Sequence, residues 1–576
     1  MIQSINFKNN RGITGIDLAV AMIVIVLFVS LIFALFYNVY ISTVGVRRNE
    51  QAISYAVAIL ETIEQYDYED VTTEEEPEDI FINDLQAVVD NINKDTAPEI
   101  ENRKTRIVRE NTNIETFTNP YIITIDVTRY EKEDHTETLD IVKTITLNTY
   151  YRIGKKEEKE KVEIKTLKTV NPAYTDSVGI QPKLLDSEAM IPVKYVYTNE
   201  ATGEGNWYVT TVTDSEWFDY SKKQWANVMI GPIFDPENGR VTAIGDMFVY
   251  IPRYAYKIAE GSYHTDTAGA IDIKFLSRGN SCKDGTKIDI KTQASEGVNA
   301  GTDYMLHPAF RFGDTNLSGI WVAKFEASAN GIDVQSLPSQ TSWTNIDVAE
   351  MFARSGEFAG NKSLDSNLVD SHMMKNIEWG AAAYLAHSKY GRNGTEIGVN
   401  TSVPYTTGGG INGAYKTNVN QSTTGNIYGI YDMSGGAAEY VMGILKGTDF
   451  YLGASGFIEQ DLQDQEKYYD LYQEANDVSQ SDDGMEENFK QNQYKIGDAI
   501  YETSSDYPVP DGGSSYWQTS TIAWFADMTR YYTSFTPYLI RGCIDTGNSW
   551  PGLFCYYAHP GNAESSVGFR IVLTAK

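Results

Sequence analysis

An uncharged stretch near the N-terminus is the strongest hydrophobic signal in the chain. No charged residue occurs between Leu18 and Val46, and residues 18–37 read LAVAMIVIVLFVSLIFALFY. An apolar helix of that length spans a bilayer core of about 30 Å. Lys8 and Arg11 precede the stretch, so the positive-inside rule places the rest of the chain outside the cell. The pattern predicts a transmembrane helix.

The helical periodicity continues beyond the apolar stretch. Ile53, Val57, Leu60 and Ile63 recur at helical spacing, which is typical of an amphipathic helix. The sequence therefore predicts one long α-helix over residues 13–68, membrane-spanning in its first half.

Residues 69–170 then alternate between apolar and polar positions, which indicates strands that bury one face. A short helical segment, IFINDLQAVVDNI, precedes them. We expect a small antiparallel sheet packed on the long helix. The alternating apolar positions are Tyr121, Ile123, Ile125, Val127, Leu139, Ile141, Ile145, Leu147, Val162 and Ile164.

Residues 171–183, which read NPAYTDSVGIQPK, form a predicted linker. The amino-acid composition changes after it. Residues 184–576 are rich in Gly, Trp and Tyr, and only one clear helix is expected, near Met374 to Ser388. Residues 458–485 are an acidic insertion for which a solvated flap is the default expectation. The predicted fold class is multidomain α+β: a long N-terminal helix with a small antiparallel sheet, then a loop-rich domain.

Composition narrows the possible functions. The formal net charge of −31 repels phosphate backbones, so we expect no nucleic-acid partner. Three cysteines in 576 residues exclude a disulfide-based scaffold. The six histidines fall in no H-E-x-x-H frame, and no nucleophile elbow or Walker loop is present.

The N-terminus resembles type IV prepilins. It reads RG-ITGID, which corresponds to a leader over residues 1–12, cleavage between Gly12 and Ile13, and an acid, Asp17, at the fifth mature position. Most pilins have Glu there. The resemblance implies a prepilin peptidase and other pilin subunits as partners, with Asp17 pairing a neighbour's terminal amine because a lone carboxylate in lipid is costly. It also implies location at a bacterial membrane and surface, with a pilus as one such location. The alternative is an ordinary signal-anchor helix.

Residues 248–576 resemble the formylglycine-generating-enzyme-like branch of the C-type lectin fold. The matching segments are GIYDMSGGAAEYVMG, LIRGC and VGFRIVL. In the first of them, Gly435 and Glu439 match the family pattern. Family members hold calcium, and the local carboxylates Asp432 and Glu439 are the candidates for it. No other cofactor is expected.

Oxidase members of this family bind copper with a cysteine pair that the resemblance places near positions 547 and 552. Both positions are Gly here, and glycine cannot replace a thiolate ligand. Cys543 and Cys555 lie elsewhere and are compatible with a disulfide, a metal site or two buried thiols, the last being favoured. The sequence therefore predicts that the protein is not an enzyme.

The segment before the closing strand is the exposed face in this fold and reads CIDTGNSWPGLFCYYAHPGNAESSV. Rigid aromatic residues mixed with short polar ones are typical of binding surfaces. We expect Phe554 and one of the adjacent tyrosines to face the core. The predicted ligand-binding residues are Asp545, Asn548, Trp550, Tyr556, Tyr557, His559 and Asn562.

Variable receptors of diversity-generating retroelements have the same fold, and the codons of this same segment are diversified in their genes. The hypothesis is that this chain resembles them. The sequence as a whole favours a non-enzymatic surface protein that binds an unknown protein or glycan for adhesion or recognition, as a minor or tip pilin-like subunit. The alternatives are a surface oxidase of the formylglycine-generating type and a structural membrane-anchored protein.

Overall fold

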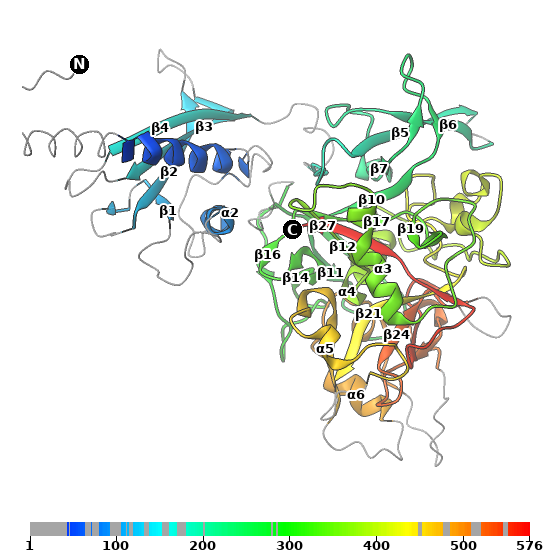
Figure 1. The fold of residues 1–576 in the computed structure, drawn as a ribbon. Coiled ribbons are helices and arrows are strands. Elements are labelled where there is room, and N and C mark those ends of the chain that lie inside the picture. Colours follow the sequence, from blue (N-terminus) through cyan, green and yellow to red (C-terminus); the bar gives the residue numbers. More distant parts are fainter. Residues whose placement is uncertain are drawn as a thin grey trace, which may run out of the picture. The chain divides into compact units, whose positions relative to one another are not determined.

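The computed structural model describes residues 43–44, 46–60, 62–63, 71, 80–92, 105–110, 112–114, 119–131, 138–151, 160–169, 180–199, 202–277, 280, 282–283, 286–446, 452–475, 484–507, 520–544 and 551–576. The chain divides into two compact units, Met1–Val170 and Asn171–Lys576 (Figure 1).

The described part of the first unit contains a four-stranded sheet in the order β1–β2–β3–β4. Strand β1 runs parallel to β2, whereas β2, β3 and β4 are antiparallel to one another. The helix α2 (Ile80–Ile92) contacts β1. The period-two pattern correctly predicted that Ile123, Ile125, Ile145 and Leu147 are buried. The strands are β1 (Arg106–Arg109), β2 (Tyr121–Glu131), β3 (Thr138–Tyr151) and β4 (Glu160–Thr169).

The helical residues 46–60 and 62–63 bury only part of the face that the sequence predicted, since Ile63 is buried and Leu60 packs against the core. Ile53 and Val57 are about two-fifths exposed, at 40% and 41%. The buried side instead carries Ala52, Tyr55 and Ala56. Small side chains allow the helix to approach the sheet closely, and the tyrosine ring packs edge-on against Tyr121, with the ring centroids 5.3 Å apart.

The predicted α+β class led by a long helix is wrong. The described chain is β-rich, with strands β1 to β27, and α2 to α6 are short helices of at most 14 residues. Over the described residues, no helix combines the length and apolar character needed to cross a membrane. This conflicts with the predicted transmembrane helix and with the prepilin interpretation that depends on it. Residues 18–37, Gly12, Ile13 and Asp17 lie outside the described residues.

The second unit has a seven-stranded sheet, within its described residues, in the order β20–β27–β17–β10–β7–β5–β6. Its core strands carry continuous buried runs, such as GIWVA in β17. The helix α3 (Val348–Asn361) packs against the edge strand β20. The strands are β5 (Met190–Asn199), β6 (Glu204–Val209), β7 (Asn227–Ile230), β10 (Asp246–Pro252), β17 (Gly319–Ala323), β20 (Val369–Met373) and β27 (Ile571–Ala575).

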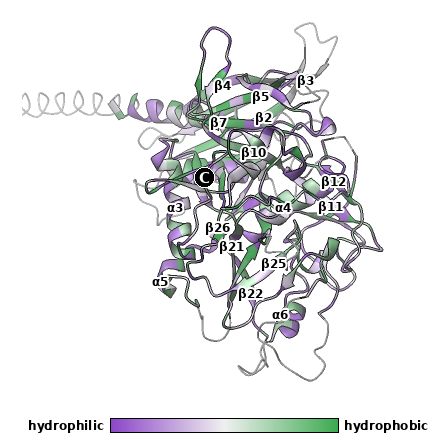
Figure 2. Cartoon of the chain, turned by 90° about the vertical axis from the view of Figure 1, so that its right-hand side faces the viewer, coloured by the Kyte–Doolittle hydropathy of each residue, from purple (hydrophilic) through white to green (hydrophobic). Residues whose placement is uncertain are grey.

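A second sheet of the same unit carries the C-terminal motifs, in the order β22–β21–β24–β25–β23, with β26 paired to β21. Figure 2 shows that β21 is mostly hydrophobic, in keeping with its buried run of eight residues. The helix α4 (Asn376–His387), expected from the sequence, contacts β21. The strands are β21 (Ala438–Lys446), β22 (Asp470–Gln473), β23 (Thr529–Arg530), β24 (Tyr538–Arg541), β25 (Tyr556–His559) and β26 (Val567–Gly568).

The acidic insertion is not a solvated flap throughout. Its β22 pairs in parallel with β21, and Tyr472 is 1% exposed. The Tyr472 hydroxyl donates to Asp498 Oδ2 at 2.9 Å. This part of the insertion therefore belongs to the core.

The other described strands and α-helices form a third sheet, three hairpins and two short helices. The third sheet comprises β11 (Tyr254–Ile258), β12 (Ile271–Phe275), β13 (Ile290–Lys291) and β14 (Tyr304–Leu306); the hairpins comprise β8 (Ile233–Phe234) with β9 (Val241–Ala243), β15 (Arg311–Phe312) with β16 (Thr315–Asn316), and β18 (Ser328–Asn330) with β19 (Asp333–Gln335); the helices are α5 (Glu459–Leu462) and α6 (Met485–Gln491).

Two helical glycines provide a matched test of this packing. A Cβ at Gly380 in α4 would lie 1.9 Å from the carbonyl oxygen of Gly497, whereas a Cβ at Gly356 in α3 would meet nothing within 4 Å. We expect Gly380→Ala to lower the free energy of unfolding by about 3 kcal/mol, because the backbone it meets cannot yield cheaply. Gly356→Ala should leave it unchanged or raise it by up to about 1 kcal/mol. Urea titrations of the full chain, followed by tryptophan fluorescence, measure the free energy of unfolding of both variants. An equal change in the two variants would contradict the packing described for Gly380.

Candidate ligand-binding site

The predicted binding segment contains β25, which forms a hairpin with the preceding strand β24. The strands pair antiparallel, with Arg541 opposite Tyr556 and Tyr538 opposite His559. Tyr556 and Ala558 are fully buried, whereas Tyr557 and His559 are half-buried. Alternate residues of a strand face opposite sides of the sheet, so β25 has one side in the core and one side at the surface.

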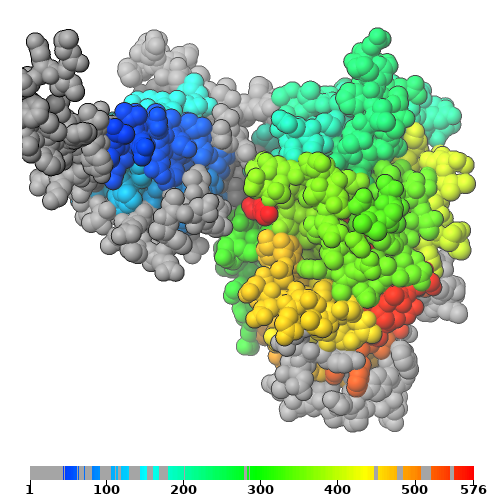
Figure 3. Space-filling model, viewed as in Figure 1, coloured from blue at the N-terminus to red at the C-terminus, as the bar shows by residue number. Residues whose placement is uncertain are grey.

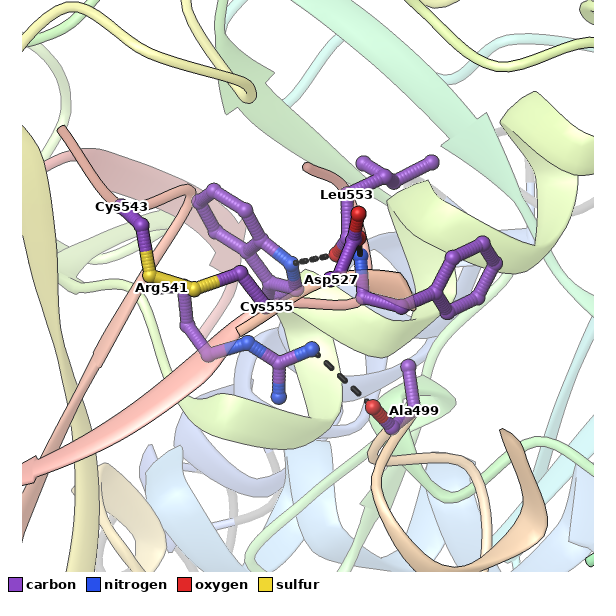
Figure 4. Close-up of a disulfide and its surroundings, with 8 residues drawn as sticks. Ala499, Asp527, Arg541, Cys543, Leu553 and Cys555 are labelled. Atoms are coloured by element: carbon purple, nitrogen blue, oxygen red, sulfur yellow. Dashed lines mark hydrogen bonds between the residues drawn. A yellow bond between two sulfur atoms is a disulfide. The ribbon is translucent and has the colours of Figure 1, made fainter. Parts of the chain in front are cut away.

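A disulfide closes the connection between these two strands. Cys543 and Cys555 are joined, with Cα atoms 6.2 Å apart, and both are buried. Figure 4 shows the bond next to Arg541, just beyond the paired ends of the strands. Of the three states that the sequence left open, the structure has the disulfide, and the favoured interpretation of two buried thiols is wrong. The base of the connection is therefore covalently fixed.

Hydrogen bonds fix the end of the connection that leads into β25. The indole Nε1 of Trp379 donates to the Leu553 carbonyl at 3.0 Å, and the Phe554 amide donates to Asp527 Oδ2 at 2.8 Å. Figure 4 shows Leu553 and Asp527 close to each other. The Phe554 ring packs edge-on against Trp524, with centroids 5.1 Å apart. These contacts hold residues 553–555 in the core.

Asp527 also explains why position 552 is glycine. A Cβ on Gly552 would lie 2.0 Å from Asp527 Oδ1. Burial raises the pKa of Asp527 well above its usual range. Position 552, where the resemblance places a copper-binding cysteine, has no room for a side chain. Position 547 lies outside the described residues.

Arg541 anchors the other strand of the hairpin. Its guanidinium is fully buried and donates to Asn376 Oδ1 at 2.9 Å and to the Asp498 carbonyl at 3.0 Å. It also donates to the Ala499 carbonyl at 3.1 Å, as Figure 4 shows. These acceptors bind the two terminal nitrogens without a full ion pair, whereas the buried Nε has no hydrogen-bond partner among the described residues. The arginine of the LIRGC motif is thus a structural anchor for β24.

His559 is held as a neutral hydrogen-bond donor. The Gly561 amide donates to its Nδ1 at 3.4 Å, and the Tyr440 hydroxyl bonds to the same atom. Because an amide can only donate, Nδ1 is the acceptor and Nε2 carries the proton. Burial lowers the pKa of His559 to about 4. The imidazole is therefore uncharged at neutral pH.

The neighbouring surface residues are aromatic and amide groups. The guanidinium of Arg530 lies over the ring of Tyr557, 5.1 Å from its centroid. Asn562 Nδ2 donates to Glu564 Oε1 at 2.8 Å. Tyr557, His559 and Asn562 are half-buried, so each is held in place and still meets solvent.

The structure brings only part of the predicted site together. Phe554 and Tyr556 face the core, as expected for Phe554 and one tyrosine of the pair, so Tyr556 is not at the surface. Tyr557, His559 and Asn562 remain as candidates. Asp545, Asn548 and Trp550 lie outside the described residues.

The two calcium candidates are buried and already engaged. Glu439 accepts from Arg570 at 2.6 and 2.9 Å. Asp432 accepts from the Gly408 amide and from Asn400 Nδ2, each at 2.9 Å. Within the described residues, no group of three or more His, Cys, Asp or Glu is placed to hold a metal ion. This arrangement does not fit a calcium site.

A buried charge network around His372 was missed by sequence reasoning. Its Nδ1 lies 3.1 Å from Asp370 Oδ1, and its Nε2 lies 3.1 Å from Glu378 Oε1. Burial alone would lower the pKa of His372, but the carboxylates of Glu378 and Asp370 outweigh burial and raise it. The i, i+2 spacing in β20 placed Asp370 and His372 on one face, whereas the approach of Glu378 from α4 has no local signal.

In comparisons with known proteins, no family model matches the chain and no curated protein gives a significant match. The assignment of function therefore depends on the chain's own residues.

The His372 network predicts a characteristic dependence of stability on pH. Because the folded pKa is raised above the unfolded value of about 6.5, the stabilisation is complete below pH 6.5 and is lost as pH rises through the folded pKa. The difference in unfolding free energy between the parent and His372→Gln should therefore shrink above about pH 6.5.

His387→Gln is the matched control. Burial lowers the pKa of His387. Below about pH 6.5 the unfolded chain therefore takes up a proton that the folded chain does not, and the free energy of unfolding falls as pH falls. The two differences should slope in opposite directions in urea titrations at several pH values. Parallel slopes would contradict the charge network.

Proposed function

We propose that the Asn171–Lys576 unit is a non-enzymatic ligand-binding domain whose contact surface lies on the outer side of β25 and the turn that follows it. The observation that carries this proposal is the division of the segment between core and surface. Phe554 and Tyr556 are fully buried, while Tyr557, His559 and Asn562 reach the surface.

The rigidity of this surface supports a role in recognition. The disulfide and the buried Arg541 fix one end of β25 and its partner strand. At the other end, the Gly561 carbonyl accepts from the Val348 amide at 3.1 Å, and the Glu564 carbonyl accepts from the Asn345 amide at 2.8 Å. A surface whose backbone is already ordered loses little conformational entropy when it binds.

The chemistry of the three residues favours a protein or glycan as the ligand. They offer a phenol ring, a neutral imidazole and an amide, which bind through ring contacts and neutral hydrogen bonds. The net charge of −31 disfavours nucleic acid. Asp545, Asn548 and Trp550, display at a bacterial surface and retroelement diversification stay predictions, because no described residue bears on them.

The state of the cysteines supports a non-enzymatic function. A copper-dependent oxidase needs thiolate ligands, but the Cys543 and Cys555 sulfurs are bonded to each other. An oxygen-uptake assay on thiol peptides with the copper-loaded chain separates the two functions. Turnover that disappears in Cys543→Ala would favour the oxidase and contradict the proposal.

Binding at the proposed surface can be tested by selection. A phage-displayed peptide library and a glycan array are screened against the full chain. We expect Tyr557→Ala and His559→Ala to weaken the selected binders about tenfold each, because rigid aromatic contacts dominate small interfaces.

Tyr494→Ala is the matched control, since Tyr494 is an exposed tyrosine outside this surface (52% exposed). It should leave the affinity unchanged. Failure to recover any binder, or binders that lose affinity equally in Tyr494→Ala, would contradict the proposed surface.

A further inference from the structure

A pocket of about 380 Å³ lies apart from the C-terminal surface. Helix α3 forms one wall with Phe352 and Gly356, β20 contributes Asp370 and His372, and Tyr468 closes the pocket from the acidic insertion. Figure 3 shows α3, the insertion and the C-terminal end of the chain together on one face. The volume falls within the usual range for small-molecule sites, about 300–1,000 Å³.

The charges inside this pocket are mutually satisfied. Asp370 Oδ1 pairs with His372 Nδ1 at 3.1 Å, and Oδ2 lies 3.3 Å from Lys467 Nζ. At the rim, Glu357 pairs with Arg354 at 3.1 Å. Lys576 is exposed, so water and salt screen its charge. A charged ligand would therefore find no unpaired, desolvated counter-ion on the walls that the structure describes.

The walls nevertheless keep hydrogen-bonding capacity. A carboxylate oxygen accepts about two hydrogen bonds, so Asp370 Oδ1, which accepts from His372, retains an acceptor site. Glu357 and Gln465 add acceptors, and Gln465 also adds an amide donor. These groups suit hydroxyls, which both donate and accept.

Aromatic rings supply the apolar part of the site. The Phe352 and Tyr468 rings meet edge-on with centroids 6.0 Å apart, and both are half-buried. The Tyr468 ring is fixed because its hydroxyl donates to Asp370 Oδ2 at 2.8 Å. Rings with convergent polar groups bind molecules that have both an apolar face and hydroxyl edges.

We propose that this pocket binds a neutral, hydroxyl-rich ligand of the size of a sugar ring. Hydroxyls donate to Asp370 and Glu357 and accept from Gln465, while the C–H face of the ring packs on Phe352 and Tyr468. The site shares no residue with the β25 surface, so it stands independently of the function proposed above.

The test uses a variant that fills the pocket. Gly356 lines it, and a Cβ there meets nothing within 4 Å, so Gly356→Phe places a ring in the pocket without a backbone clash. Gly261→Phe is the matched control, because a Cβ at Gly261 also meets nothing within 4 Å and Gly261 is not a lining residue. Gly360→Phe is a second blocking variant with the same open space. Circular dichroism checks the folding of each.

The full chain is titrated with the methyl glycosides of glucose, galactose, mannose and N-acetylglucosamine, using saturation-transfer NMR and calorimetry. We expect at least one to bind with a Kd near the millimolar range, both blocking variants to weaken it about tenfold or more, and Gly261→Phe to leave it unchanged. Absence of binding by all four, unchanged binding in the blocking variants, or tighter binding of methyl glucuronide or glucosamine than of the neutral glycosides would overturn the proposal.

Discussion

The buried ion pair between Arg570 and Glu439 is the interaction on which the second unit depends. The guanidinium donates to the two carboxylate oxygens at 2.9 and 2.6 Å, and also to the Ala323 carbonyl at 2.8 Å and to the Tyr431 carbonyl at 2.9 Å. A buried pair offsets its desolvation only with such complete geometry. Because Glu439 lies in β21 and Ala323 in β17, one side chain joins the two large sheets. The nearby Glu326 is fully buried and its Oε1 has no hydrogen-bond partner. Burial raises the pKa of this carboxyl well above its usual range.

This junction also determines what the C-terminal segment can do. Arg541 and Arg570 are both fully buried at the two ends of the segment, and between them residues 552–556 are buried, held by the disulfide and Asp527. The outward residues of β25 are thereby held in an ordered position, because their neighbours along the strand are packed in the core. A surface of that kind is suited to recognition, where the contact residues must be ordered before a partner arrives.

The sequence predicted the features that depend on local periodicity and failed on those that depend on contacts between distant segments. Alternation identified β2 and β3, and the helix near residues 374–388 was expected. In the N-terminal helix, Ile53 and Val57 were wrongly expected to be buried, because small residues such as Ala52 pack closely on a sheet and carry little hydrophobic signal. The insertion was expected to be solvated, although β22 is held by pairing with β21. Neither the disulfide nor the approach of Glu378 to His372 could be read from the chain, since both require the tertiary fold. The N-terminal predictions Gly12, Ile13 and Asp17 lie outside the described residues.

The central claim is that β25 presents one side to solvent while its other side is locked in the core. Hydroxyl-radical footprinting of the full chain, read at single residues by mass spectrometry, tests this most directly, since oxidation of aromatic side chains follows their solvent contact. The account predicts that Tyr557 and His559 are oxidised rapidly and that Phe554 and Tyr556 are protected until the protein unfolds. Protection of all four residues, or oxidation of Tyr556 as fast as that of Tyr557, would contradict it.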